Sequence, residues 1–245
     1  MTAHSIQGRT VTTPVEVRRA RQWATQFVVP AARAQAAIEH TGLQVARPFP
    51  GRAIVTLVVV DYEDTDLDAY HEVGVGFLVR PHDAPPAEGE GALVREFWSG
   101  SMGAYIHQLP VDQAFTLDAG VSIWGFPKFL AGISLRQVGR YTVCELAHEG
   151  EHVFTLGVAD RGWFPLPSRT PPSYSFHEGV LRKTEWQQAG ARTTARLGGA
   201  ELTLGSHPIA KELEALGLPK RALMTVATPA MQATFGDAEV VSPTG

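Results

Sequence analysis

The sequence predicts an α+β fold, with a large, mostly antiparallel, curved or barrel-like sheet at its core and few helices. Two observations predict it. Short segments rich in valine and other apolar residues recur along the chain, and most follow one another with no helix between them. Only three stretches have the composition and the ends of a helix. No repeat, low-complexity tract or linker divides the chain, so residues 1–245 are expected to form one domain.

The first third of the chain contains three expected strands and one expected helix. The strands cover residues 21–29, 53–62 and 70–79, where β-branched and aromatic residues are frequent. A helix over 31–40 is predicted by Pro30 at its first turn and Gly42 just after its end. Successive side chains of the strand over 70–79 point to opposite faces of the sheet. One face is expected to hold His71, Val73, Val75 and Phe77, and the other Glu72, Gly74, Gly76 and Leu78.

The rest of the chain alternates turn signals with short strands. Prolines and glycines predict a loop over 81–91 and another over 161–173. Helices are expected over 111–119 and over 208–216, the second ended by Gly217. The remaining segments are expected strands: 133–138, 141–147, 152–158, short strands within 193–204, and 222–227.

Charge and cysteine usage narrow the class of protein. The formal net charge is −4 and no basic block is present, so neither nucleic acid nor a membrane surface is an expected partner. The longest apolar run, over 53–60, is too short to span a bilayer, and the N-terminus has no signal-peptide pattern. Cys144 is the only cysteine, which fits a reducing compartment. These features predict a cytoplasmic protein.

Lys128 is the only lysine in the first 182 residues, and its neighbours are Trp124, Phe126, Pro127 and Phe129. A free lysine has a pKa of about 10.4, so almost none of it is the neutral nucleophile at pH 7. Burial in an apolar pocket can lower that pKa by roughly 3–5 units and release an amine that attacks carbonyl groups. The same local sequence also fits a lysine that snorkels from a strand end into water.

Two segments around this lysine, YIHQLP at 105–110 and GVSIWGFPKFLAG at 120–132, resemble the acetoacetate decarboxylase family. The resemblance implies that Lys128 is a Schiff-base lysine. The segment AYHEVGVG at 69–76 implies that Glu72 is a pocket carboxylate, and the gapless match over 21–45 implies that Arg21 faces the carboxylate of a substrate. The family's closing pattern is matched by the C-terminal run from Ser206. The resemblance also implies a homo-oligomer.

Two departures separate the chain from the decarboxylase itself. Phe129 stands where the decarboxylase has a second lysine, and an aliphatic residue near Leu57 replaces a further carboxylate. A neighbouring cation helps to activate the lysine of acetoacetate decarboxylase. Without it, desolvation is expected to provide most of the activation, and acetoacetate does not follow as the substrate.

The first hypothesis is a lyase that acts on a small keto acid, by decarboxylation or by aldol addition and dehydration, through an enamine on Lys128. Glu72 would be a general acid–base group and Arg21 would pair with the substrate carboxylate. The side chains expected to line the substrate pocket are Trp124, Phe126, Phe129 and His107. No cofactor is expected, and no metal site either, since His148 and His152 flank a turn without a third ligand.

The alternative hypothesis is a small-molecule binding protein that has lost catalysis on the same scaffold. Val121, Ser122 and Phe129 motivate it, because the family usually has charged residues at these positions.

Overall fold

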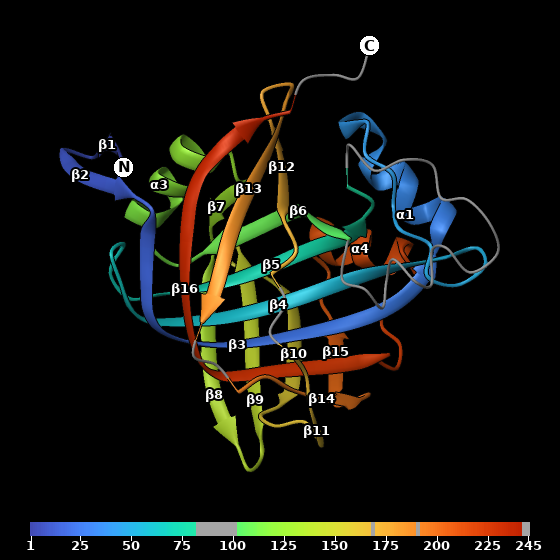
Figure 1. Cartoon of the computed structure of the whole chain (residues 1–245). Helices are drawn as coiled ribbons and strands as arrows, with labels where there is room; N and C mark the ends of the chain where they lie inside the picture. The colour runs from blue at the N-terminus through green and yellow to red at the C-terminus, as the bar shows by residue number, and fades with distance from the viewer. Residues whose placement is uncertain (82–101, 168–169, 190–191, 242–245) are drawn as a thin grey trace.

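A computed structural model describes residues 1–81, 102–167, 170–189 and 192–241. Seven of its strands close into a barrel, because the last of them pairs with the first (Figure 1). In barrel order these strands are β3 (Val15–Pro30), β4 (Arg52–Thr65), β5 (Tyr70–Val79), β6 (Gly103–Val111), β12 (Ser173–His177), β13 (Val180–Ala189) and β16 (Met224–Val240). All neighbours are antiparallel except β6 and β12. The predicted fold class is confirmed.

A second, four-stranded antiparallel sheet crosses the barrel strands at a steep angle in Figure 1. Its strands, in order, are β15 (Ala200–Leu204), β10 (Glu151–Ala159), β9 (Tyr141–His148) and β8 (Gly132–Val138). Four short strands complete the picture: β1 (Thr2–Ile6) and β2 (Arg9–Thr13) form a hairpin, β7 (Lys128–Leu130) runs parallel to β6, and β11 (Phe164–Pro165) pairs with β14 (Thr194–Leu197).

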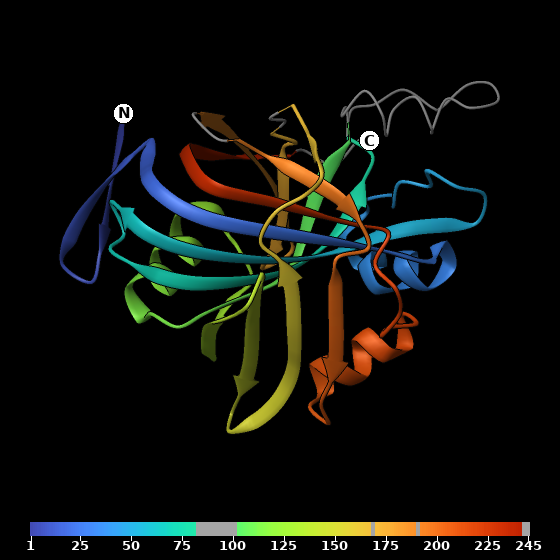
Figure 2. The same cartoon turned by 90° about the horizontal axis from the view of Figure 1, so that it is seen from below.

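The described residues form three α-helices: α1 (Ala31–Ile38), continued by the 3-10 turn η1 (Glu39–Thr41), α3 (Ala114–Trp124) and α4 (Pro208–Ala215). Helix α4 lies beside β15 and β10, as Figure 2 shows from below. None of the described helices has the length and apolar character needed to cross a membrane.

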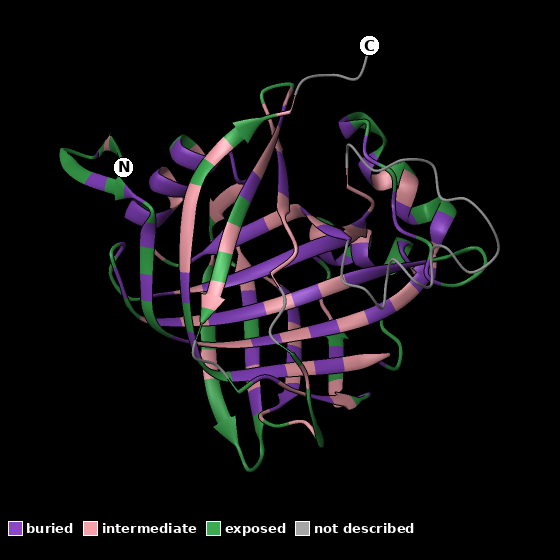
Figure 3. Cartoon of the chain, in the orientation of Figure 1, coloured by how far each residue is buried: buried purple, intermediate pink, exposed green. Residues whose placement is uncertain are grey.

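The strands β4 and β5 bury residues on both faces, whereas the buried residues of β3 alternate with less buried ones; purple residues are frequent along all three strands in Figure 3. One face packs on the second sheet, where Phe27 and Leu57 belong to the same hydrophobic cluster as Phe154. The other face packs on α3 and the N-terminal hairpin, where Tyr62 and Tyr70 belong to the same cluster as Phe115. Because side chains alternate along a strand, the face on which a residue stands decides which of two separate cores it enters.

Three expectations about the elements need correction. The helix expected over 111–119 begins only at Ala114, because Val111 ends β6 and the Gln113 side chain accepts the N–H of Thr116. Pro30 is the residue before α1, not its first residue. The strand expected over 222–227 extends to Val240, with register shifts around its proline at position 229. The loop expected over 81–91 lies, apart from Pro81, outside the described residues.

Candidate active site

A buried ion pair links Lys128 and Glu72. The Nζ atom of Lys128 lies 2.8 Å from Glu72 Oε2, and the two side chains are only 3% and 10% exposed. Lys128 Nζ also donates a hydrogen bond to Thr116 Oγ1 at 3.1 Å. The structure therefore buries Lys128, and it excludes the snorkelling lysine that the local sequence also allowed.

The turn that follows α3 directs Lys128 back over the helix. Gly125 ends α3 in the left-handed region at φ 60°, and its N–H bonds to Gly120 and Val121 carbonyls. Pro127 then leads into β7, where Lys128 stands opposite Leu109 of β6. A side chain at Gly125 would be strained by that φ and would also contact the Arg182 guanidinium at 2.8 Å. The Gly-Phe-Pro segment thus reverses the chain and lays Lys128 on α3.

Small residues on α3 make room for the lysine. A Cβ atom at Gly120 would lie 2.4 Å from Lys128 Cδ and 2.5 Å from Cε, so the aliphatic stem fills the space that glycine leaves. Thr116 lies four residues earlier, on the same helix face. This spacing places the bare backbone under the stem of Lys128 and a hydroxyl group at its ammonium.

Glu72 reaches the lysine from β5. It stands opposite Val60 of β4, and Tyr62 and Tyr70 form the next cross-strand pair on the same face. The two phenol rings stack at 4.4 Å, and the Tyr62 hydroxyl donates to Glu72 Oε1 at 3.4 Å. Burial, followed by the charge of Glu72, raises the pKa of both tyrosines well above 10. Both phenols therefore stay neutral, and the Tyr62 hydroxyl donates a hydrogen bond to the carboxylate.

The Tyr70 ring also faces the lysine, since its centroid lies 5.2 Å from Lys128 Nζ. The ammonium is thus surrounded by one carboxylate, one hydroxyl and one aromatic face, with little water. Such a site stabilises a charge only through these partners.

Two of the predicted pocket aromatics, Trp124 and Phe126, hold the turn in place. Both are buried, and their rings stack at 5.8 Å. The Trp124 indole N–H donates to the Gly236 carbonyl at 2.7 Å, and Ser175 Oγ donates to the Trp124 carbonyl at 2.7 Å. Trp124 thereby fixes the start of the lysine turn to β16 and β12.

The structure does not bring Arg21 to the Lys128–Glu72 pair. Arg21 stands opposite Asp61 of β4, and Asp61 stands opposite His71 of β5. This row of side chains alternates with the row that contains Glu72, so Arg21 lies on the other face of the sheet. Its guanidinium pairs there with Asp61 and Glu63. The gapless match identified the strand correctly but could not show which face Arg21 occupies.

His107 and Phe129 also lie on the far side from Lys128 Nζ. They line a separate cavity of about 430 Å³ together with His148 and His207. The ring of Phe129 packs edge-on against His148 at 4.7 Å. The ring of His107 pairs with Glu212 of α4 at 2.5 Å, and this hydrogen bond is the main cause that lowers the pKa of Glu212. The predicted contacts of His107 and Phe129 with the substrate of Lys128 are therefore not part of this geometry.

Sequence reasoning missed Tyr62, Tyr70, Thr116 and Gly120. Tyr70 could have been found, because it stands two residues before Glu72 and therefore shares its face of the strand. Thr116 and Gly120 have the four-residue spacing of a helix face, but their role depends on which face of α3 the Lys128 side chain packs against after the chain reverses. Tyr62 depends on the register of β4 against β5.

Comparison with known proteins identifies the family and the fold. The family model described as acetoacetate decarboxylase matches residues 4–242. A solved acetoacetate decarboxylase from Legionella pneumophila subsp. pneumophila str. Philadelphia 1 is 16% identical, covers 96% of this chain and 91% of its own, and has a TM-score of 0.70. An acetoacetate decarboxylase-like enzyme from Sphingomonas wittichii RW1 is 16% identical, covers 96% of both chains, and has a TM-score of 0.63.

A third group of solved structures is the enduracididine biosynthesis enzyme MppR. Its complex with pyruvate is 16% identical, covers 96% of this chain and 93% of its own, and has a TM-score of 0.63. Another MppR structure holds the condensation product of pyruvate and imidazole 4-carboxaldehyde. At these identities the solved structures establish a shared fold. No curated protein sequence matches the chain. Because the family model spans nearly all of the sequence, the chain belongs to the acetoacetate decarboxylase family.

Proposed function

We propose that the protein is a lyase that binds a small keto acid as an imine on Lys128. The observation that carries the proposal is the contact of 2.8 Å between Lys128 Nζ and Glu72 Oε2 in a site where both side chains are nearly inaccessible to water. An amine within hydrogen-bond distance of a carboxylate has the geometry of a nucleophile and its base. Membership of the acetoacetate decarboxylase family supports the same reading.

Lys128 must lose a proton before its nitrogen can attack a carbonyl carbon. Glu72 Oε2 is the acceptor within reach, and proton transfer to it converts a buried ion pair into two neutral groups. A site of low polarity makes neutral groups less costly than charged ones. Thr116 and Tyr62 hold the two partners in line from either side.

The neutral amine then adds to the ketone carbon, and the proton held by Glu72 passes to the departing oxygen, so that one water leaves and a protonated imine remains. In a β-keto acid the bond to the carboxylate breaks next. Carbon dioxide leaves, and the electron pair of the broken bond moves to the imine nitrogen through an enamine. Glu72 takes up one proton from solvent and passes it to the enamine carbon, and one water hydrolyses the resulting protonated imine to release the ketone and Lys128.

The other outcome is aldol chemistry. In a substrate such as pyruvate the bond that breaks is a methyl C–H bond, whose proton passes to Glu72, and the enamine carbon attacks an aldehyde. The MppR complexes with pyruvate and with its condensation product support this outcome for a relative with the same fold. Arg21 takes no part in the proposed steps, because Asp61 and Glu63 hold it on the opposite face. A homo-oligomer remains a prediction.

Borohydride trapping tests the imine. The protein is incubated with pyruvate, acetoacetate and longer keto acids, reduced, digested and analysed by peptide mass mapping. We expect an adduct on the peptide that contains Lys128, in the wild type and in Lys211→Met, whose lysine is exposed on α4, and no adduct in Lys128→Met. Modification confined to surface lysines, or no adduct with the whole panel, would contradict the proposal.

One observation favours the second candidate, a binding protein without catalysis. Glu72 and Thr116 already occupy two of the three N–H groups of Lys128, which is also the arrangement of a structural ion pair. Proton NMR in heavy water separates the two functions. An enzyme that forms an enamine replaces the methyl protons of pyruvate with deuterium, whereas a binder leaves them unchanged.

A further inference from the structure

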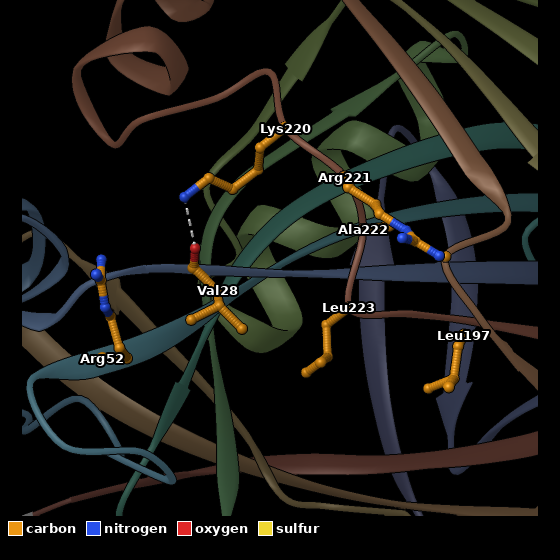
Figure 4. Close-up of a pocket in the computed structure, with 8 residues that line it drawn as sticks. Val28, Arg52, Leu197, Lys220, Arg221, Ala222 and Leu223 are labelled. Carbon is orange, nitrogen blue, oxygen red and sulfur yellow. Dashed lines mark hydrogen bonds between the residues drawn. The ribbon is translucent and has the colours of Figure 1, made fainter.

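A second site lies at the other end of the barrel strands. It is a groove of about 630 Å³, called here the basic groove, with three cationic side chains, Arg52, Lys220 and Arg221, around an apolar floor that includes Val28, Leu197 and Leu223 (Figure 4). The volume is within the range of small-molecule sites. We propose that the basic groove binds a small organic anion with carboxylate or phosphate groups on an apolar body.

Among the residues that the structure describes, the cations of the groove have no carboxylate partners. Arg33 joins them, because a Cβ atom at Gly217 would lie 3.9 Å from Arg33 Nη1 and 4.0 Å from Lys220 Nζ. Across the described part of the chain, no ion pair involves Arg33, Arg52, Lys220 or Arg221. The whole protein carries a net charge of −4, so four cations around one groove, without a carboxylate partner among the described residues, form a local positive field that attracts anions.

The backbone holds these cations apart from one another. Lys220 donates to the Val28 carbonyl at 2.9 Å, beyond the point where β16 stops pairing with β3 at Gln26. This bond anchors the ammonium and leaves its other hydrogens for a ligand. Arg221 lies over the β14–β15 turn, where its Nε atom would be 3.7 Å from a Cβ at Gly198. In Figure 4, Arg52 and Arg221 lie on opposite sides of Val28 and Leu223. One small ion would not contact both arginines, whereas an extended anion would.

The floor of the groove indicates that the ligand is not purely ionic. Leu197 is 60% exposed, and it lines the groove together with Val28 and Leu223. Covering it would remove apolar surface from water, which stabilises a complex by about 25 cal/mol per Å². An aromatic or aliphatic carboxylate or phosphate ester combines both requirements.

The basic groove is independent of the lysine site. Ala20 of β3 belongs to the core that contains Tyr62 and Tyr70, whereas Val28 of the same strand lines the groove. Eight residues of strand span about 26 Å. A ligand in the groove therefore does not contact Lys128, and its binding is expected to leave imine formation unchanged.

Calorimetric titration with phenyl phosphate, and with inorganic phosphate for comparison, tests the proposal. We expect phenyl phosphate to bind more tightly than phosphate, and its affinity to fall as sodium chloride screens the cations. The variant Arg52→Gln/Arg221→Gln should weaken the binding by about tenfold or more, which corresponds to the loss of charge-assisted contacts.

The matched control is Arg136→Gln/Arg140→Gln, which removes two exposed arginines on and just after β8 and changes the net charge equally. It should bind phenyl phosphate like the wild type. Equal weakening in both variants would show a general charge effect and overturn the proposal, as would absence of binding to the wild type. Borohydride trapping on Lys128 in the groove variant should proceed at the wild-type rate.

Discussion

The substitution Gly120→Ala tests whether the aliphatic stem of Lys128 packs against α3 as closely as the structure indicates. The new methyl group would lie 2.4 Å from Lys128 Cδ and 2.5 Å from Cε. Ordinary carbon contacts need about 3.5–4.0 Å, so the stem of the lysine must move by roughly 1 Å or more. An unrestrained side chain would simply rotate away. Here the far end is held by Glu72 and Thr116 inside the protein, so the displacement carries the nitrogen with it.

The expected cost to stability is small and the expected cost to chemistry is large. Overpacking destabilises by about 1–3 kcal/mol, while exchanging glycine for alanine inside a helix returns about 1 kcal/mol. The free energy of unfolding should therefore fall by no more than about 2 kcal/mol. A misplacement of about 1 Å in a reacting group can cost on the order of 10²-fold in rate. Imine formation should slow by about that factor.

Urea denaturation and the rate of borohydride trapping on Lys128 measure the two effects separately. Gly132→Ala is the control, because its Cβ would lie at ordinary contact distances, 3.7 Å from the Ala147 carbonyl oxygen and 4.0 Å from the Ala147 Cβ. This variant should trap the keto acid at the wild-type rate. If Gly120→Ala also traps at that rate while remaining folded, close packing of Lys128 on Gly120 does not position the reacting nitrogen, which would refute the prediction.

Two of the four further predictions concern the partners of Lys128, and two concern Cys144 and Asp237. Glu72→Gln leaves the buried ammonium without its counter-charge, so urea denaturation should show a loss of about 3–5 kcal/mol and trapping should be abolished, whereas Lys128→Met/Glu72→Gln should recover most of the stability. Thr116→Val removes one hydrogen bond to Lys128 and should cost about 1 kcal/mol in the same assay and slow trapping, without abolishing it. Burial raises the pKa of the Cys144 thiol to about 12, so a disulfide reagent at pH 8 should modify it only after urea unfolds the protein, and immediate reaction of the native protein would refute its burial. Hydrogen bonds from Thr2 and Thr13, with His4 adding to them, lower the pKa of Asp237 from 3.8 to about 2. Its stabilising contribution is therefore present above about pH 4 and is lost as the pH falls toward 2. In urea denaturation, the free energy of unfolding of Asp237→Asn should be lower than that of the wild type at pH 6 and equal to it near pH 2.

The sequence predicted the strands of the barrel best where the apolar pattern was dense. The valine-rich segment of β4 and the alternating segment of β5 were found with nearly correct ends, and the alternation in β5 also separated Glu72 from His71. The β1–β2 hairpin and β13 were not found, because their segments are mostly polar and partly exposed. Such strands are stabilised by their pairing partners, and a single sequence contains no record of the partner.

The candidate site shows the same division. The residues of a continuous motif, Trp124 to Lys128, were found because their local pattern is specific. Arg21 was placed on the wrong side, because the face of β3 depends on its register against β4, and that register shifts twice between Val17 and Ala20. Phe129 could have been assigned correctly from the sequence. It follows Lys128 in a strand, and consecutive strand residues point to opposite faces.

Phe129 leaves Lys128 without the neighbouring cation of the decarboxylase, so another group has to take part in its activation. The resemblance to the decarboxylase predicts that, without a cation at position 129, desolvation provides most of the activation of Lys128. The structure offers a different route in the site itself, since Glu72 is in direct contact with Lys128 and Tyr62 donates to the same carboxylate. Burial disfavours two opposite charges less than one isolated charge, but it favours two neutral groups over both. In the proposed mechanism Glu72 is therefore the group that accepts the proton Lys128 has to lose, and its contact of 2.8 Å with Lys128 stands where the decarboxylase has a second cation beside its lysine.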